Sequence, residues 1–319
     1  MRALILSGIS ARSFMWGKLG AAIVLSCTLV IVSLCVAIVP ALWRSEESIP
    51  LVRIVLLVLV YAAALLSFAF LVSWFSARLG SSHSAFSATA FAWLFTALLC
   101  PVLAGQLATT MFPDVDEQVL KNDIQLKAQT PFWVGDAQES AVIELGEKIA
   151  EEFGAESFES LGFDREALVL QAHEEFANVV YDEIYGALTE THLNQDNVLR
   201  WASSISPLLA ASRISSGVSG IDLMAQLTFA RQAEAHRRLI IKQLNDDMMI
   251  NSGGQAFEYM ADEELWKKTP DFEQEPLPLG SVLIRYWFES IALISWLIAT
   301  GFLAYRAIDE ALSGDSRHV

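Results

Sequence analysis

The sequence predicts an all-α membrane protein with about four transmembrane helices and one large, mostly helical domain outside the membrane. Hydrophobic residues make up 54% of the 319 residues, and they are concentrated in a few long runs. Acidic residues are concentrated in a single polar segment between the third and fourth runs. No stretch shows the alternation of polar and apolar residues that is typical of strands.

Four apolar runs are long enough to span a hydrocarbon core, which takes roughly 20 helical residues. The predicted spans are residues 19–42, 51–75, 85–111 and 281–306. Pro101 and Gly105 are expected to kink the third span. The cysteines Cys27, Cys35 and Cys100 all lie inside apolar runs, so they are expected to be packing residues, with no disulfide or zinc site in the polar domain.

The short loops predict the orientation of the spans, because cytoplasmic loops carry an excess of Lys and Arg. Residues 1–18 contain three basic residues and no acid, and the loop after the second span contains only Arg78. Both are therefore expected in the cytoplasm, together with the tail 307–319. The loop after the first span holds two arginines and two glutamates, which weakens its assignment to the outside.

Residues 112–280 are then expected outside the membrane as an acidic helical domain. Residues 113–280 hold 31 of the 37 acidic residues but only 12 of the 21 basic ones. Apolar residues recur at helical spacing from Val142 and again from Leu168, after a candidate N-cap at Asp164. A further helix is expected from Asp222 to Met249, ending at Gly253–Gly254. The strong negative charge argues against a nucleic-acid partner.

No catalytic constellation is visible, so we do not expect this chain to be an enzyme. Gly17-Lys18 lacks the first glycine and the Ser or Thr of a phosphate-binding loop, so if the protein uses ATP, another chain supplies the site. His173, His192 and His236 could bind a metal if they converge, but an ordinary solvated acidic surface is the simpler interpretation. No cofactor is expected in this chain.

Arg285 and Glu289 are one helical turn apart at the outer end of the last span. Ionisable residues at membrane depth are candidates for a functional site. A self-neutralising pair at the membrane interface is the alternative.

The basic, amphipathic segment 1–18 includes Arg12, Phe14, Trp16 and Lys18. It fits an anchor on the lipid surface or a helix that docks on a partner ATPase. The stretch ISARSFMWGKL at 9–19 resembles the cytoplasmic linker of ABC-2 type transporter permeases. Three further stretches resemble the extracytoplasmic insertion of a bacterial subgroup whose function is unknown: ESFESLGFDREALVLQAHEE at 156–175, SISPLLAASRISSG at 204–217 and FARQAEAHRRLIIKQLNDDM at 229–248.

The resemblance covers the whole chain in order and implies a permease subunit in the bacterial inner membrane, with residues 112–280 in the periplasm. It implies a separate subunit that binds ATP and Mg, and a second permease, either an identical copy or a sibling. Arg12, Phe14, Trp16, Lys18 and Arg78 are then the candidates for coupling to the ATPase, and the substrate stays open. Such permeases usually have six spans, so the first two are expected to be missing from this chain. A membrane scaffold or sensor whose outer domain binds a partner is the alternative function.

Overall fold

The chain folds into helices that form two compact units. The computed structural model describes residues 51–79, 81–129, 132 and 137–315, together with Ser13, Gly17, Gly20, Ala21, residues 23–32 and Val36. Unit 1 comprises Met1–Met111, Gln195–Ala225 and Pro276–Val319, and unit 2 comprises Phe112–Asn194 and Gln226–Glu275. All elements of the described part are helical, as predicted.

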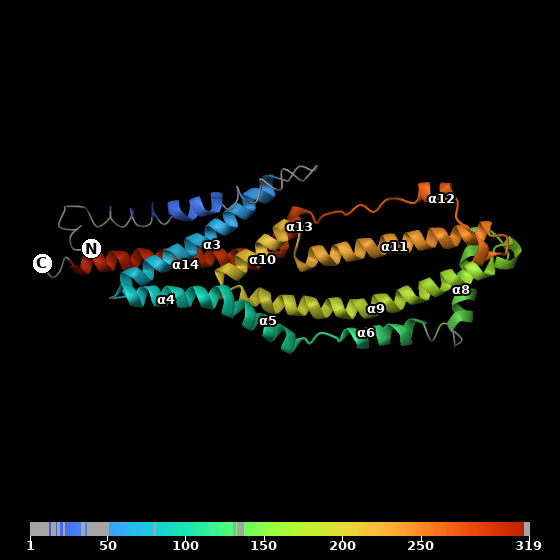
Figure 1. Ribbon diagram of the computed structural model, residues 1–319, viewed down its shortest axis with the longest axis horizontal. Coiled ribbons are helices and arrows are strands. Elements are labelled where there is room, and N and C mark those ends of the chain that lie inside the picture. The colour runs from blue at the N-terminus through green and yellow to red at the C-terminus, as the bar shows by residue number, and fades with distance from the viewer. Residues whose placement is uncertain are drawn as a thin grey trace. The chain divides into compact units, whose positions relative to one another are not determined.

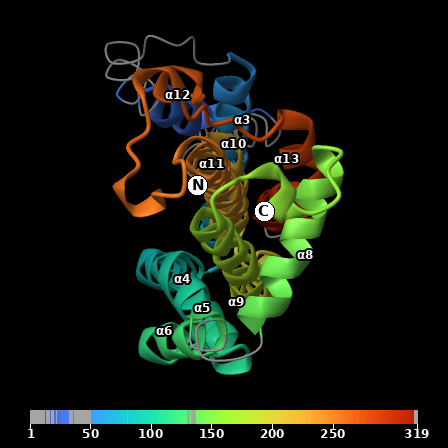
Figure 2. The same ribbon diagram turned by 90° about the vertical axis from the view of Figure 1, so that its right-hand side faces the viewer.

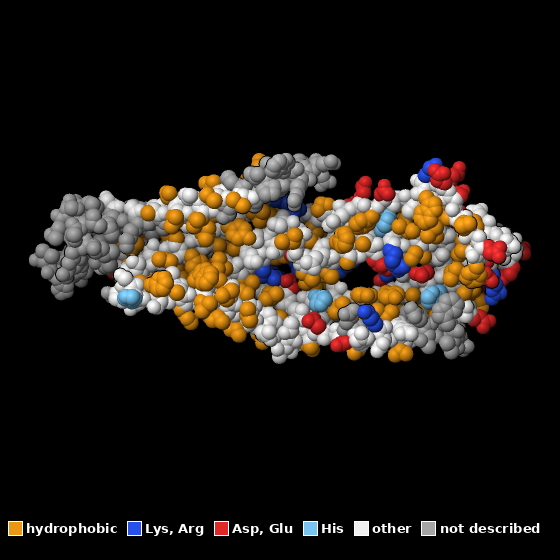
Figure 3. Space-filling view, viewed as in Figure 1, with side chains coloured by type: hydrophobic (Ala, Val, Ile, Leu, Met, Phe, Trp, Pro, Cys, Tyr) orange, Lys and Arg blue, Asp and Glu red, His pale blue; other side chains and the backbone are white. Residues whose placement is uncertain are grey.

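Unit 1 contains three helices that are long and apolar enough to cross a membrane. They are Leu51–Arg78, Ser82–Met111 and Trp287–Glu310, and they correspond to three of the four predicted spans. Large apolar side chains on them are exposed, including Phe86 at 74% and Ile298 at 66%, and hydrophobic atoms cover the face of unit 1 in Figure 3. Such a surface suits a bilayer and would be costly in water. Of the first predicted span, the structure describes a helix over Ile23–Val32, and most of the remainder lies outside the described residues.

The helices α3 (Leu51–Arg78) and α14 (Trp287–Asp315) pack side by side and run parallel (Figure 1). Arg78 at the end of α3 pairs with Glu310 near the end of α14, with 2.9 Å between the charged atoms. At the opposite end, Arg53 donates hydrogen bonds to the carbonyl oxygens of Val218 and Leu277. These contacts fix which ends of the two spans lie at the same level.

The other described span contains a π-helical turn beside its proline. It is built from α4 (Ser82–Leu94), the π turn Phe95–Leu99 and α5 (Cys100–Met111). The ring of Pro101 would clash with the carbonyl four residues earlier in a regular α-helix, and a wider turn relieves that crowding. The structure thus has a π turn just before Pro101, in the span where the sequence predicts a kink.

The last predicted span is interrupted near its start. The helix α13 (Leu279–Arg285) ends before Tyr286, whose φ of −94° and ψ of 22° lie outside the helical range, and α14 begins at Trp287. The predicted single helix over 281–306 is thus two helices. Tyr286 is buried and anchored by its hydroxyl, which donates to Asp222 over 2.6 Å.

The structure also divides the predicted outer domain 112–280, because residues 195–225 belong to unit 1. They contain the end of α9 (Arg165–Ala202), a turn, and α10 (Pro207–Ser219). The small residues Ala210 and Ala211 let α10 pack closely against Ala64 in the middle of α3. We call residues 195–220 the hairpin.

Unit 2 is organised by two long helices, α9 and α11 (Leu223–Asn251), which run alongside one another (Figures 1 and 2). Asp164 accepts from the backbone N–H of Glu166 at the start of α9, and Gly253 and Gly254 follow α11 with positive φ angles. Both ends lie where the sequence predicts them. The core joins Phe132 to α8 (Ala137–Glu152), the start of α9 and the end of α11. Shorter elements complete the unit: α6 (Glu117–Ile124), a π turn at Gln125–Gln129, 3₁₀ turns at Phe158–Leu161 and Ala256–Glu258, and α12 (Glu263–Lys268).

Candidate functional site

The turn of the hairpin lies at the level of the middle of the candidate spans. The hydroxyl of Ser206 donates to the carbonyl oxygen of Thr96 over 2.7 Å, and Thr96 is at the midpoint of Ser82–Met111. The indole N–H of Trp296, well inside the last span, donates to the carbonyl oxygen of Ser204 over 2.9 Å. The hairpin therefore enters the layer of apolar helices and turns back within it.

The contact between Ser206 and Thr96 follows from the π turn. The backbone N–H of Cys100 bonds to the carbonyl oxygen of Phe95, so it is not available to Thr96. The next residue is Pro101, which has no N–H to donate. The Thr96 carbonyl is thus left without a donor from its own helix, and the Ser206 hydroxyl supplies one. Ser206 also caps α10 by accepting from the N–H of Leu209 over 3.0 Å.

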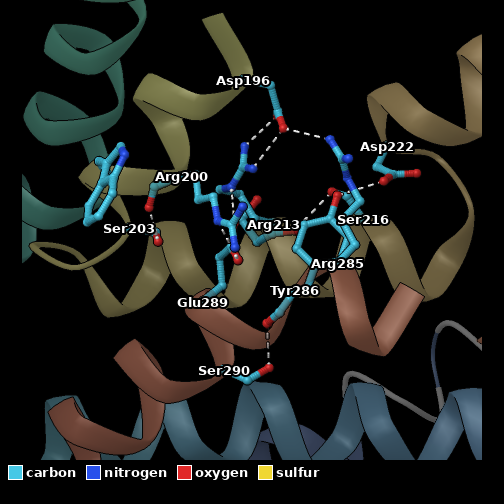
Figure 4. Close-up of polar contacts among 12 residues, drawn as sticks. Asp196, Arg200, Ser203, Arg213, Ser216, Asp222, Arg285, Tyr286, Glu289 and Ser290 are labelled. Atoms are coloured by element: carbon cyan, nitrogen blue, oxygen red, sulfur yellow. Dashed lines mark hydrogen bonds and ion pairs between the residues drawn. The ribbon is translucent and has the colours of Figure 1, made fainter. Parts of the chain in front are cut away.

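A network of buried charges joins the hairpin to the last span (Figure 4). Arg213 of α10 forms two parallel hydrogen bonds with Asp196 of α9, of 2.7 and 3.1 Å. Its Nε donates to Glu289 of α14 over 3.0 Å. Arg285 of α13 donates to Asp196 over 3.0 Å, and the Nε of Arg200 lies 4.0 Å from Glu289. We call these five residues the ionic network.

The centre of the ionic network is shielded from solvent, whereas the side chains of Arg200 and Arg285 are 30% and 31% exposed. The network is also incompletely hydrogen-bonded. The side chains of Glu289 and Arg213 are 1% and 10% exposed. The Oε2 of Glu289 and the Nε of Arg285 have no hydrogen-bond partner. Burying charges is expensive, and a paired buried charge that loses its partner costs about 3–5 kcal/mol. The network therefore holds the hairpin against α13 and α14 only while its members are paired.

Aromatic rings surround the ionic network. The guanidinium of Arg200 lies 5.6 Å from the ring centroids of both Trp287 and Phe288, and that of Arg213 lies 5.9 Å from the ring of Tyr286. At such distances a cation is attracted to the ring faces. Gly217 of α10 faces the Tyr286 ring so closely that a Cβ there would overlap it.

The predicted pair Arg285 and Glu289 takes part in this network, but on two different helices. No hydrogen bond joins the two side chains to each other among the described contacts; each bonds instead to a hairpin residue, Arg285 to Asp196 and Glu289 to Arg213. Their spacing of four residues predicts two neighbours on one helix. Because the helix breaks at Tyr286, each side chain contacts the hairpin instead of the other.

The candidate coupling residues are described only in part. Arg12, Phe14, Trp16 and Lys18 lie outside the described residues. Arg78 is at the end of α3, where it is exposed and paired with Glu310.

The three candidate histidines are not gathered into a metal site. His173 packs on the ring of Phe132, His236 on that of Phe272, and His192 is 3.7 Å from a carboxylate oxygen of Asp114. Within the described part of the chain, no group of three or more His, Cys, Asp or Glu side chains is arranged to hold a metal ion.

Asp196, Arg200 and Arg213 were not identified from the sequence. They lie in a segment whose acidic surroundings marked it as part of a solvated domain. The available signal is the stretch SISPLLAASRISSG, in which a single arginine stands among small and apolar residues. A lone charge in such a stretch calls for a buried partner.

The arrangement of the ionic network suits a conformational role rather than bond-breaking chemistry. Three arginines pair with two carboxylates, which leaves one net positive charge. Ser203 and Ser206 are both engaged, because their hydroxyls donate to backbone carbonyls. Such a network can hold two elements together and release them when one charge is neutralised or drawn away.

Comparison with known families gives a match over the middle of the chain. Residues 121–275 match the family model described as Domain of unknown function (DUF3526). The matched region includes the hairpin and most of unit 2 and names no activity. No curated protein and no solved structure matches the chain.

Proposed function

We propose that this chain is the permease subunit of an ABC-2 type transporter in the bacterial inner membrane. A separate subunit would bind and hydrolyse ATP with Mg, and a second permease, identical or related, would complete the path. Unit 2 would lie on the periplasmic side. The ordered resemblance of four sequence stretches supports the family, and the three apolar helices support a multi-pass membrane subunit.

The observation that carries the proposal is the hairpin with its ionic network. An anchor needs only apolar helices, since each unsatisfied polar group in hydrocarbon costs several kcal/mol. Here a turn lies at the level of the middle of the candidate spans, and the buried charges Glu289 and Arg213 lie nearer the outer end of the last one. Interrupted helices and ionisable residues at membrane depth are typical of proteins that move a solute.

Transport would use the hairpin as the moving part. The ionic network links it to α14, which continues past the level of Arg78 and Glu310, on the side where the ATPase is expected to dock. Movement of α14 would then pull on Glu289 and Arg213 and shift the hairpin.

Co-purification tests the proposal directly. The full chain, extracted in mild detergent, should bring down an ATP-binding subunit, and lipid reconstitution of the pair should raise the ATPase rate. Glu289→Gln should weaken this stimulation while leaving the complex intact. Recovery of no ATPase, together with an unchanged ATPase rate on mixing, would overturn the proposal.

A membrane scaffold or sensor is the second candidate. It is favoured by the separate core of unit 2 and by its charge, since residues 112–194 and 226–275 contain 29 acidic and 10 basic residues. A scaffold should bind its partner through unit 2 and ignore changes at Glu289. Deleting all of 115–278 is a poor discriminator, because it also removes the hairpin from unit 1.

A further inference from the structure

Unit 2 contains a cavity that the proposed function does not use. It has a volume of about 980 Å³ and lies between α9 and α11, entirely within unit 2. Figure 3 shows the hollow with charged side chains at its edge. Cavities of about 300–1,000 Å³ are the size that takes small molecules.

One part of the cavity is crossed by ion pairs that carry an excess of negative charge. Arg238 pairs with Asp182 over 2.6 Å and with Glu234 over 2.7 Å. Arg237 pairs with Glu234 over 2.8 Å and with Glu174 over 3.4 Å. Two guanidinium groups thus face three carboxylates. Arg237 and Arg238 hold the pKa of Glu234 at about 2, so this carboxylate keeps its charge at any physiological pH.

The rest of the wall combines an aromatic and apolar surface with polar residues, which are His173, Thr189, Glu190, His192 and Arg231. Glu190 and Arg231 carry opposite charges, so the excess of one negative charge is unchanged. Tyr181 and Tyr185 stack with ring centroids 6.0 Å apart, and Leu188, Leu193 and Leu227 continue the surface. Tyrosine faces attract cations, and apolar side chains favour a ligand with a hydrophobic body.

The net charge of unit 2 also favours a cationic ligand. Unit 2 has a formal net charge of −19, from 29 acidic and 10 basic residues. A field of this sign concentrates cations near the surface and repels anions.

We propose that this cavity binds an amphipathic organic cation, with its positive group beside Glu174, Asp182 and Glu234 and its apolar body along Tyr185 and Leu188. The ligand's charge would neutralise the unmatched carboxylate of the ion-pair group. The site requires no ATPase, so its test and that of the transport proposal succeed or fail separately.

The test is equilibrium binding to the full chain in nanodiscs of zwitterionic phosphatidylcholine. The probe is berberine, a planar aromatic cation, followed by its fluorescence. We expect saturable binding, and much weaker binding of the anion 8-anilinonaphthalene-1-sulfonate. Asp182→Asn should weaken berberine binding by roughly tenfold, the lower end of what a hydrogen bond to a charged group contributes. Asp182→Glu should restore most of it.

Glu183→Gln is the matched control for charge. Glu183 is the next residue of α9, is exposed and does not line the cavity, but its substitution removes the same unit of charge from unit 2. It should leave binding unchanged. Tyr185→Ala, which leaves the ion pairs intact, should weaken binding several-fold, and Tyr185→Phe should not.

Three results would overturn the inference. They are the absence of saturable berberine binding, equal losses in Asp182→Asn and Glu183→Gln, and an anionic probe that binds as tightly as the cation. Circular dichroism and gel filtration of each variant ensure that a loss of binding is not a loss of fold.

Discussion

Ser206 is fully buried, and its hydroxyl serves two helices at once. It donates to the carbonyl oxygen of Thr96 and accepts from the N–H of Leu209. Because both backbones lie at the level of the candidate spans, no bulk water is expected to replace the hydroxyl.

Ser206→Ala should therefore destabilise unit 1. Losing an N-cap costs about 1 kcal/mol, and leaving a buried carbonyl without a donor adds about 1–3 kcal/mol. The measurement is the midpoint of thermal denaturation in mild detergent. Ser216→Ala, at a half-buried position of the same helix, should have little effect because its hydroxyl bonds back to the carbonyl oxygen of Ser212 within the helix. Equal effects of the two substitutions would contradict this account.

The lowered pKa of Glu234 predicts that the stability of unit 2 depends on pH. Its pKa falls from an ordinary value near 4.5 to about 2 because Arg237 and Arg238 bond to it. A depressed carboxyl pKa adds stability above the unfolded value, and that stability is lost as the pH falls through the folded value. Wild type should thus be more stable than Glu234→Gln at pH 7, and the difference should shrink below about pH 4.5 and vanish near pH 2. Thermal denaturation of both proteins across this range measures it, and a difference that does not change with pH would contradict it.

At the scale of elements, α10 depends on close contact with the break between α13 and α14. Gly217 has no space for a Cβ beside the Tyr286 ring, and Tyr286 cannot move away without losing its bond to Asp222. The break and the hairpin therefore support one another.

Gly217→Ala should push α10 away from Tyr286. Overpacking of this kind costs about 1–3 kcal/mol, although alanine is the better helix former. The control is Gly105→Ala in α5, where nothing lies within 4 Å of the added methyl group. The control should be neutral or slightly stabilising in thermal denaturation. A stabilised Gly217→Ala would show that the helices are not packed as described.

The ionic network holds the hairpin to α14. Glu289→Gln removes a buried charge from Arg213 and should cost about 3 kcal/mol or more. Glu310→Gln on the same helix breaks the exposed pair with Arg78 and should cost about 1 kcal/mol or less. Denaturation of both variants in detergent gives the comparison, and equal costs would contradict the buried role of Glu289.

At the scale of the whole molecule, the predicted topology places the loop before α4 and the residues of unit 2 on opposite sides of the membrane. The helices α3 and α14 run in the same direction, and α4 and α5, which lie between them in the sequence, run back in the opposite direction. This course of the chain is compatible with the predicted topology.

Single cysteines introduced into a chain without Cys27, Cys35 and Cys100 test the topology. Ser81→Cys, before α4, should react with a membrane-impermeant maleimide only after the cells are opened. Glu263→Cys, at the exposed start of α12, should react in intact spheroplasts. Labelling of both positions from the same side would refute the topology.

The sequence by itself determined the helical class, the apolar spans, the concentration of acidic residues in one region and the caps at Asp164 and Gly253–Gly254. Each of these depends on residues that are close in the chain, through helical periodicity, hydropathy or local backbone bonds. Only the tertiary structure decided the position of the hairpin, the break at Tyr286 and the partners of Arg285 and Glu289. They depend on contacts between residues far apart in sequence, such as Ser206 with Thr96 and Asp196 with Arg285. No local pattern encodes these contacts, because each partner satisfies a need created elsewhere: a carbonyl left without a donor beside Pro101, or a charge buried among apolar helices.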